Sequence, residues 1–283
     1  MLIAILNDTH AGVKNGSDIF LDYSAKFYDE TFFPYLLEKG IKKIVHLGDY
    51  FEHRKYVNYK VLEHNYKCFI SKLYEYDMTM DIIPGNHDAY VNIKYKNSLC
   101  HLTNYLDQSA PLNQDSPFPY IKKIKNIALI GISTAVPSPP FMCWGRVSKE
   151  QLIKLEEILS SIEKENNFVL LFLHHPIHHY GAFNLKGLLN KEELIETISK
   201  FNIHLIIHGH LHREIHNSIE IKEVLVPCIG APSGSRDKNS GLSYLEYQID
   251  KINDKWNLKV YRRQYNFTDE IFESLIIKEV SYD

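Results

Sequence analysis

Five short apolar runs in this sequence each end abruptly in polar residues, and this repetition limits the folds that the chain can adopt. The runs are rich in Ile, Leu and Val, a composition typical of strands that are buried on both faces of a sheet. We therefore predict five buried strands with polar tips, in the segments LIAILNDTH (residues 2–10), KKIVHLGD (42–49), MDIIPGNHD (80–88), FVLLFLHHP (168–176) and IHLIIHGHLH (203–212).

Segments with helical periodicity separate these runs, at residues 24–40, 59–76, 148–165 and 190–201. Ser148 and Asn190 precede the last two segments, and both residue types are favoured helix N-caps because their side-chain oxygens accept hydrogen bonds from the first turn. The alternation of strands and helices predicts an α/β layered fold.

Polar residues of metal-ligand type lie at every predicted strand end. In open α/β sheets the ligand crevice lies outside the carboxyl ends of the strands, so these side chains are expected to meet there. Taken singly, an aspartate after a strand is as often a turn or cap residue, and a lone histidine is more often structural. The whole set makes a metal site the better prediction: Asp8, His10, Asp49, Asn86, His174, His210 and His212.

The donor types indicate the chemistry of this site. Two carboxylates, one amide oxygen and four imidazoles without a thiolate suit manganese, iron or zinc ions better than calcium or a structural zinc. Seven donors exceed what one ion needs if it keeps an open position, so two ions sharing a bridging carboxylate are expected. Such a pair activates a bridging water and orients a phosphoryl group, which makes phosphoester hydrolysis the predicted reaction.

The composition of the chain argues against several other classes of protein. The net charge of −3 gives no overall signature of nucleic-acid or membrane binding, and the basic run at residues 120–125 is expected to be a solvated face. The N-terminus lacks the features of a signal peptide, and no run approaches about 18 apolar residues, so a cytoplasmic protein without a membrane span is expected. Four scattered cysteines predict reduced thiols: Cys68, Cys100, Cys143 and Cys228.

The ordered motifs D-x-H (8–10), G-D (48–49), G-N-H-D (85–88), H-x-P (174–176) and G-H-x-H (209–212) resemble the calcineurin-like metallophosphoesterase superfamily. The resemblance implies a sandwich of two mixed β-sheets flanked by helices, with the metal site at the carboxyl ends of the strands. We expect this domain to span residues 1–265, followed by a C-terminal tail at residues 266–283.

The resemblance also implies a role for each residue. One ion would be held by Asp8, His10 and His212, and the other by Asn86, His174 and His210, with Asp49 bridging both. His87 would be catalytic, contacting the phosphate and helping the leaving group to depart. From its place in the motif, Asp88 is expected to steady the loop or the imidazole. Two divalent ions are therefore the expected cofactors, with Mn²⁺ first and Fe or Zn as alternatives.

Other residues near these motifs keep alternative interpretations. His175 is expected to point away from His174 and to pack, because neighbouring residues of an extended segment face opposite ways. His178 and His179 follow in a loop that either lines the substrate pocket or is simply exposed. His53 and Arg54 follow Asp49 where some relatives carry a phosphate-binding arginine, and their roles stay open.

The two parts of the chain resemble different branches of the superfamily. Residues 1 to about 105 are similar to phage SbcD-type nuclease subunits, whereas residues from about 118 to 245 are similar to bacterial Icc/CpdA-type phosphodiesterases. After His212 only about 70 residues remain, read as two strands (242–250 and 255–265) and a short tail, which leaves little room for a DNA-binding cap and a partner-docking segment.

Together with the slightly acidic charge, this length favours a hydrolase of phosphodiester or phosphomonoester bonds whose partner is a small-molecule or nucleotide substrate. The alternative is an SbcD-type DNA exonuclease or endonuclease subunit, for which nucleic acid would be the partner. A binding module without catalysis is disfavoured because no ligand position has been lost.

Overall fold

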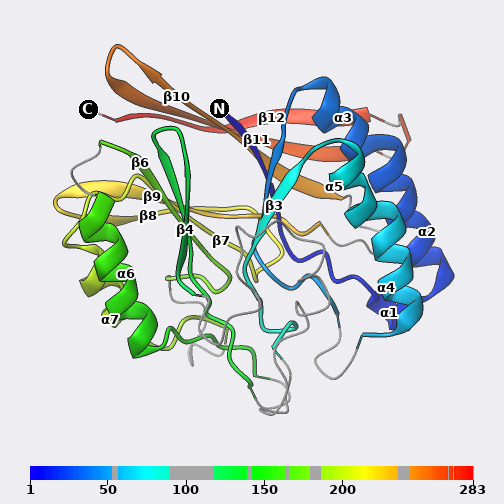
Figure 1. Ribbon diagram of the computed structural model, residues 1–283, viewed down its shortest axis with the longest axis horizontal. Helices are drawn as coiled ribbons and strands as arrows, with labels where there is room; N and C mark the ends of the chain where they lie inside the picture. Colours follow the sequence, from blue (N-terminus) through cyan, green and yellow to red (C-terminus); the bar gives the residue numbers. More distant parts are fainter. Residues whose placement is uncertain are drawn as a thin grey trace.

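The runs of Ile, Leu and Val form strands of two six-stranded sheets, which pack face to face (Figure 1). The computed structural model describes residues 1–52, 57–89, 118–138, 142–162, 166–178, 186–234, 242–266, 268–269 and 271–282. All five predicted buried strands are present, and the predicted pair of mixed sheets flanked by helices is confirmed.

The first sheet contains strands from the N-terminal and the C-terminal parts of the chain. Its order is β12-β11-β10-β1-β2-β3, with β1, β2 and β3 parallel and the other three strands antiparallel. The strands are β1 (Leu2–Leu6), β2 (Lys43–His46), β3 (Thr79–Ile82), β10 (Ser243–Ile252), β11 (Lys255–Asn266) and β12 (Ile271–Tyr282).

The second sheet has the order β4-β5-β6-β7-β9-β8, in which β5, β6, β7 and β9 are parallel and the two edge strands are antiparallel. Its strands are β4 (Tyr120–Ile124), β5 (Ile127–Gly131), β6 (Phe168–Leu173), β7 (Leu205–His208), β8 (Ile215–Ile221) and β9 (Val224–Gly230). The basic run at residues 120–125, expected as a solvated face, thus contains the edge strand β4, whose first residue Tyr120 is buried.

Helices cover the outer face of each sheet, as Figure 1 shows: α2 to α5 lie on one side of the sandwich, and α6 and α7 lie on the other. The first group contains α1 (Val13–Gly16), α2 (Asp18–Phe27), α3 (Phe33–Glu38), α4 (Tyr59–Asn65) and α5 (Ser71–Glu75), with π-helical turns at Tyr28–Phe32 and Tyr66–Ile70. The second group is α6 (Lys149–Ile162) and α7 (Lys191–Ile198). In the described part of the chain, no helix has the length and apolar character needed to cross a bilayer.

The two predicted N-caps behave differently. Ser148 caps α6, since its Oγ accepts a hydrogen bond from the backbone N–H of Gln151 at 3.2 Å. Asn190 does not cap α7 with its side chain. Its Oδ1 instead accepts from the N–H of Val147 at 3.0 Å and its Nδ2 donates to the carbonyl of Val147 at 2.9 Å. This pairing holds the chain before α6, and it was not predictable because Val147 is distant in sequence.

The C-terminal region contains more sheet than predicted. After His212 there are five strands, β8 to β12, instead of two strands and a tail. Residues 266–283, expected as a tail, contain β12, which pairs with β11 along its length and has an irregularity opposite Val260 and Tyr261. The rings of Trp256 on β11 and Tyr282 on β12 both meet that of Phe168 in the second sheet edge to face, so both strands take part in the packing between the sheets.

A buried ion pair joins β2 to β3 within the first sheet. Lys43 Nζ lies 2.5 Å from Asp81 Oδ2, and the Asp81 side chain is completely buried. Removing one partner of such a pair leaves an uncompensated buried charge. We expect Asp81→Ala to lower the free energy of unfolding by about 3–5 kcal/mol, measured by urea denaturation. The control Glu63→Ala breaks an exposed pair with Lys67 and should leave the midpoint unchanged; equal midpoints for both variants would contradict the expectation.

Candidate metal centre

Backbone hydrogen bonds tie together the loops that follow the parallel strands. After β1 and β2, the N–H of Asp8 donates to the carbonyl of Gly48 at 3.1 Å, and the N–H of His10 donates to the carbonyl of Asp49 at 3.0 Å. After β6 and β7, the N–H of Gly209 donates to the carbonyl of His174 at 2.9 Å. The loops therefore present their side chains at one end of the sandwich.

Two glycines let the loops after β2 and β3 approach closely. A Cβ at Gly48, which has φ +98°, would lie 2.5 Å from the backbone N of Gly85. A Cβ at Gly85 would lie 2.1 Å from Asp49 Oδ1. No other residue type fits either position, because each added carbon would meet atoms that cannot move aside. The glycines of the G-D and G-N-H-D motifs thus bring Asp49 against the loop that carries Asn86.

The backbone of the predicted ligands is itself unusual. Five of them adopt the left-handed conformation: Asp8 (φ 48°), His10 (46°), Asp49 (51°), His210 (72°) and His212 (54°). A positive φ is uncommon outside glycine, and Asp, Asn and His tolerate it better than most residues. Such conformations persist where the surrounding structure holds them, and they concentrate at functional sites.

One group of donors combines Asp8, His10, Asp49 and His212, whose ligand atoms all lie within 4.8 Å of one another. The Nε2 atoms of His10 and His212 are 3.2 Å apart, and His212 Nε2 is 3.8 Å from Asp8 Oδ1. Asp8 and Asp49 are buried, whereas the side chain of His212 is 48% exposed. We call this group the first metal position.

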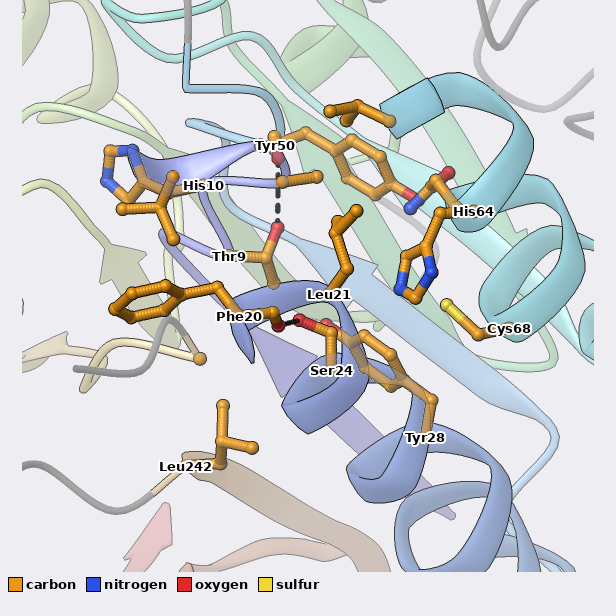
Figure 2. A pocket seen from close by; sticks show the side chains of 16 residues that line it. Thr9, His10, Phe20, Leu21, Ser24, Tyr28, Tyr50, His64, Cys68 and Leu242 are labelled. Atoms are coloured by element: carbon orange, nitrogen blue, oxygen red, sulfur yellow. Dashed lines mark hydrogen bonds between the residues drawn. The ribbon is translucent and has the colours of Figure 1, made fainter. Parts of the chain in front are cut away.

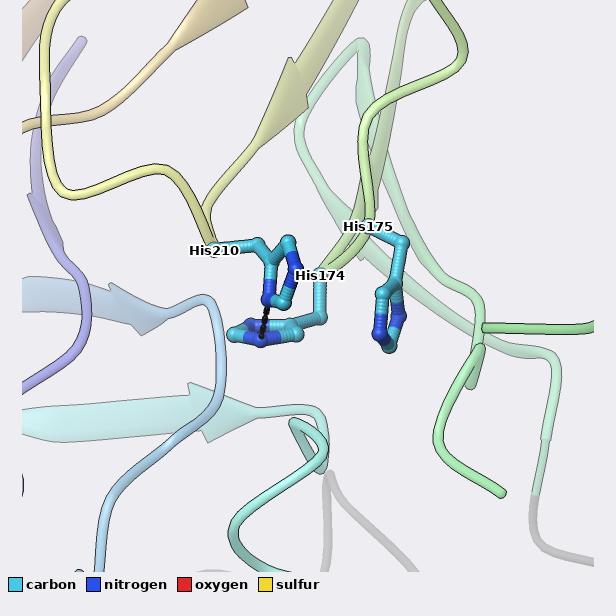
Figure 3. Close-up of side chains that lie close together, drawn as sticks. All are labelled: His174, His175 and His210. Carbon is cyan, nitrogen blue, oxygen red and sulfur yellow. Dashed lines mark hydrogen bonds between the residues drawn. The ribbon is translucent and has the colours of Figure 1, made fainter. Parts of the chain in front are cut away.

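The remaining predicted donors form a second group around His174. His174 Nε2 lies 3.2 Å from His210 Nδ1 and 3.2 Å from Asn86 Oδ1 (Figure 3). We call these three residues the second metal position. Asp49 lies between the two positions, because its Oδ2 is 3.9 Å from His10 Nε2 and 3.4 Å from His174 Nε2.

The hydrogen-bonding pattern fits a cation. His174 Nδ1 lies 2.8 Å from the carbonyl of Leu47, which can only accept, so Nδ1 carries the hydrogen and the lone pair of Nε2 faces the other donors. Among the described residues, the buried atom Asp8 Oδ1 has no hydrogen-bond partner. A buried polar atom without a partner is costly, and a metal ion would satisfy it.

The electrostatics agree with this reading. Burial raises the pKa of the Asp8 carboxyl to about 7, so a nearby cation would be needed to keep it ionised at neutral pH. Burial alone would lower the pKa of His174, but the Asp49 and Asp8 carboxylates outweigh it and raise that pKa to about 9. The cluster therefore attracts positive charge, and a proton and a metal ion compete for the same nitrogen lone pair.

The G-N-H-D loop places His87 and Asp88 in different surroundings. His87 donates its backbone N–H to Asp49 Oδ1 at 2.7 Å, its Nδ1 lies 2.7 Å from the carbonyl of Glu52, and its side chain is 30% exposed. Asp88 is buried and accepts hydrogen bonds from the N–H groups of Tyr50, Phe51 and Gly85 at 2.9–3.2 Å. Asp88 thus ties the loops after β2 and β3 together, the steadying role expected for it.

The other histidines singled out in the sequence are placed as follows. His175 is buried, with Nδ1 2.7 Å from Thr134 Oγ1, which agrees with the expected packed role. It does not point fully away from the site, since its ring centroid is 4.6 Å from that of His210 (Figure 3). His178 is partly exposed, whereas His179, His53 and Arg54 lie outside the described residues. The described cysteines Cys68, Cys143 and Cys228 form no disulfide, and Cys100 lies outside the described residues.

A small cavity lies beside His10, between the tip of β1 and helices α2 and α4 (Figure 2). Its volume is about 30 Å³, and its lining includes Thr9, Ser24, His64 and Cys68. This volume holds one or two water molecules and is far below the several hundred Å³ of typical ligand pockets. The cavity is therefore too small for a ligand of ordinary size.

Two residues that sequence reasoning missed contact the site directly. Asn7 is buried, and its Nδ2 donates to Asp8 Oδ2 and to the carbonyl of Ala231. Glu52 Oε2 lies 2.6 Å from His10 Nδ1. The only sequence signal for Asn7 is a polar residue directly after an apolar strand, and Glu52 gave a signal only through its place three residues after Asp49.

Comparisons with known proteins agree with this geometry. A family model described as "Calcineurin-like phosphoesterase" matches residues 1–214. A "Probable glycerophosphodiester phosphodiesterase GpdQ" of Arcobacter nitrofigilis is 28% identical over 154 residues, which cover 52% of this chain and 50% of that protein. A "Probable cyclic nucleotide phosphodiesterase" of Vesicomyosocius okutanii is 28% identical over 180 residues, which cover 62% of this chain and 66% of that protein.

The chain thus matches between half and two thirds of the length of these curated relatives. Among solved structures, a dimetal phosphatase from Danio rerio aligns over 100% of this chain and 98% of its own, with a TM-score of 0.64 and 13% sequence identity. At that identity the likeness concerns the fold, and it extends over both sheets.

Proposed function

Because this chain belongs to the calcineurin-like phosphoesterase family, we propose that it is a metal-dependent phosphodiesterase. The observation that carries the proposal is the convergence of the seven predicted donors, from five loops, around the carboxylate of Asp49. Donors of these types at these distances suit two divalent ions. Both curated relatives are named as phosphodiesterases, which supports a diester substrate for this chain as well.

In this proposal Asp8, His10 and His212 hold one ion at the first metal position. Asn86, His174 and His210 hold the other at the second, and Asp49 contacts both. Two divalent ions, with Mn²⁺ as the expected metal, would supply the charge that neutralises a phosphoryl group and would acidify a water at neutral pH.

We propose that His87 acts on the departing group of the substrate. Its Nδ1 is occupied by the carbonyl of Glu52, which leaves Nε2 as the nitrogen available to the substrate. Its ring meets that of His10 edge to face at a centroid distance of 4.7 Å, so it lies beside the first metal position. When both ring nitrogens are protonated, His87 can donate the Nε2 proton to an oxygen that leaves phosphorus.

A side-by-side assay tests the proposed function against the nuclease alternative. Purified protein with added Mn²⁺ is offered bis-p-nitrophenyl phosphate, cyclic AMP and linear duplex DNA. We expect turnover of the artificial diester and slower or absent cleavage of the duplex. Neither curated relative is named as a nuclease, so the alternative depends on the resemblance of residues 1 to about 105 alone. Efficient duplex cleavage without diester turnover would reverse the order of the two functions.

The same preparation tests the metal requirement. Protein stripped with a chelator should be inactive, and titration with Mn²⁺ should restore the rate until close to two ions are bound per chain, as counted by elemental analysis. The reason is that the donors divide into two groups that share Asp49. A stripped protein with full activity, or saturation at one ion, would refute the two-ion assignment.

A further inference from the structure

Glu52 contacts both histidines that flank Asp49. Its carboxylate Oε2 lies 2.6 Å from His10 Nδ1, and its backbone carbonyl lies 2.7 Å from His87 Nδ1. The side chain is 27% exposed, whereas the His10 side chain is 5% exposed. The two groups are thus in close polar contact, with the carboxylate facing the Nδ1 side of a buried imidazole.

We infer that Glu52 is a positioning residue that holds His10 with its Nε2 turned toward the first metal position. A carboxylate can only accept, so the hydrogen of the imidazole resides on Nδ1 and the lone pair on Nε2. His10 Nε2 lies 3.2 Å from His212 Nε2. Both nitrogens would hold the proposed ion at the first metal position. The inference rests on the proposed function, because it assumes that His10 is a ligand.

The carboxylate contact with a ligand histidine is made at the first metal position and not at the second. In the second metal position the corresponding nitrogen, His174 Nδ1, is held by the carbonyl of Leu47 and not by a carboxylate. A carboxylate partner makes the imidazole a stronger donor than a neutral carbonyl does. Removing the Glu52 side chain should therefore weaken one ion and spare the other. Glu52 contacts His87 through its backbone carbonyl, which any residue at position 52 retains, and through its carboxylate, 3.8 Å from His87 Nδ1, so metal binding and not the rate is the readout that reports on His10.

Metal titration of stripped protein tests this directly. Co²⁺ is titrated into wild type, Glu52→Ala and Glu52→Gln, with calorimetry giving two dissociation constants and visible absorption following the ligand set. In Glu52→Ala we expect one constant to rise about 10- to 100-fold and the other to stay within about twofold. Glu52→Gln should fall between, because its amide oxygen still accepts the hydrogen bond but carries no charge.

Glu214→Ala is the matched control. Glu214 Oε1 lies 2.7 Å from His216 Nε2, a contact of the same kind with a histidine that has no assigned ligand role. This variant should keep both constants. If wild type binds two ions and Glu52→Ala binds both as tightly, the inference is overturned while the proposed function stands. Parallel weakening of both ions in both variants would also overturn it, and a wild type that binds fewer than two ions would overturn the proposed function as well.

Discussion

Asp49→Ala is expected to abolish hydrolysis and to weaken both metal positions together. Its carboxylate is buried, and its Oδ2 is the atom that approaches both His10 and His174. Although burial alone would raise the pKa of Asp49, the neighbouring His174 holds it well below its ordinary value, so the group carries its negative charge. Loss of metal-based charge stabilisation worth several kcal/mol corresponds to a rate reduction of about 10³-fold or more.

The comparison with other ligand variants makes this result decisive. Asp8→Ala should weaken chiefly the ion at the first metal position, whereas Asp49→Ala should weaken both, as measured by metal content after dialysis. Asp49→Asn is the matched control for folding, because its amide oxygen can still accept the hydrogen bond from the His87 N–H. An Asp49→Ala protein that retains two ions would show that another group joins the positions.

His87→Ala is expected to keep near-normal metal content while the rate falls roughly 10²- to 10⁴-fold, the range usual for a general acid. The side chain is 30% exposed and, in the proposal, is not a ligand, so its loss leaves the seven donors in place. The reduction should be smaller for a diester that releases p-nitrophenolate, which needs little protonation. It should be larger for a diester that releases an alkoxide.

Two measurements separate this role from others. Rates for both leaving groups are compared in wild type and variant, together with metal content by elemental analysis. His216→Ala serves as the control. His216 lies on β8, pairs with Glu214, which precedes that strand, and has no assigned role. Equal losses with both leaving groups would indicate that His87 positions the phosphate, and loss of an ion would indicate that it is a ligand.

Strands β1, β2, β6 and β7 were predictable because burial on both faces leaves little choice of residue type, whereas β5 and β9, which are also central, were not among the predicted strands. Phe168–Leu173 and Leu205–His208 are buried along their whole length, so their sequences are almost uniformly apolar. The strands β8 and β12 escaped prediction for the opposite reason. Their exposed and half-buried residues alternate or mix, and in β12 the pattern is further broken by the irregularity opposite Val260. Such edge strands differ little from surface loops in composition.

The candidate site divides in the same way. The seven donors could be anticipated because each directly follows a strand, and strand ends in such sheets converge. The contacts of Glu52 with His10 and of Asn7 with Ala231 could not, since they depend on how separate loops lie against each other in space. Asn190 shows the converse. Its place before a helix predicted a cap, but its side chain hydrogen-bonds to the backbone of Val147, which is distant in sequence. The local sequence pattern predicts where a functional residue lies along the chain better than it predicts which residues it contacts in the folded protein.

The left-handed backbone at five of the donor residues limits which substitutions protein engineering can use there. At Asp8, His10, Asp49, His210 and His212 a β-branched residue such as Val, Ile or Thr would strain the main chain whatever its chemistry. Attempts to retune metal preference at these positions therefore have to avoid β-branched residues, and exchanges among Asp, Asn and His add the least strain. At Asn86 and His174, which are not among the positive-φ residues, the range of tolerated substitutions is limited by ligand chemistry and packing instead. Directed evolution toward a new metal therefore has its widest choice of residues at the second metal position.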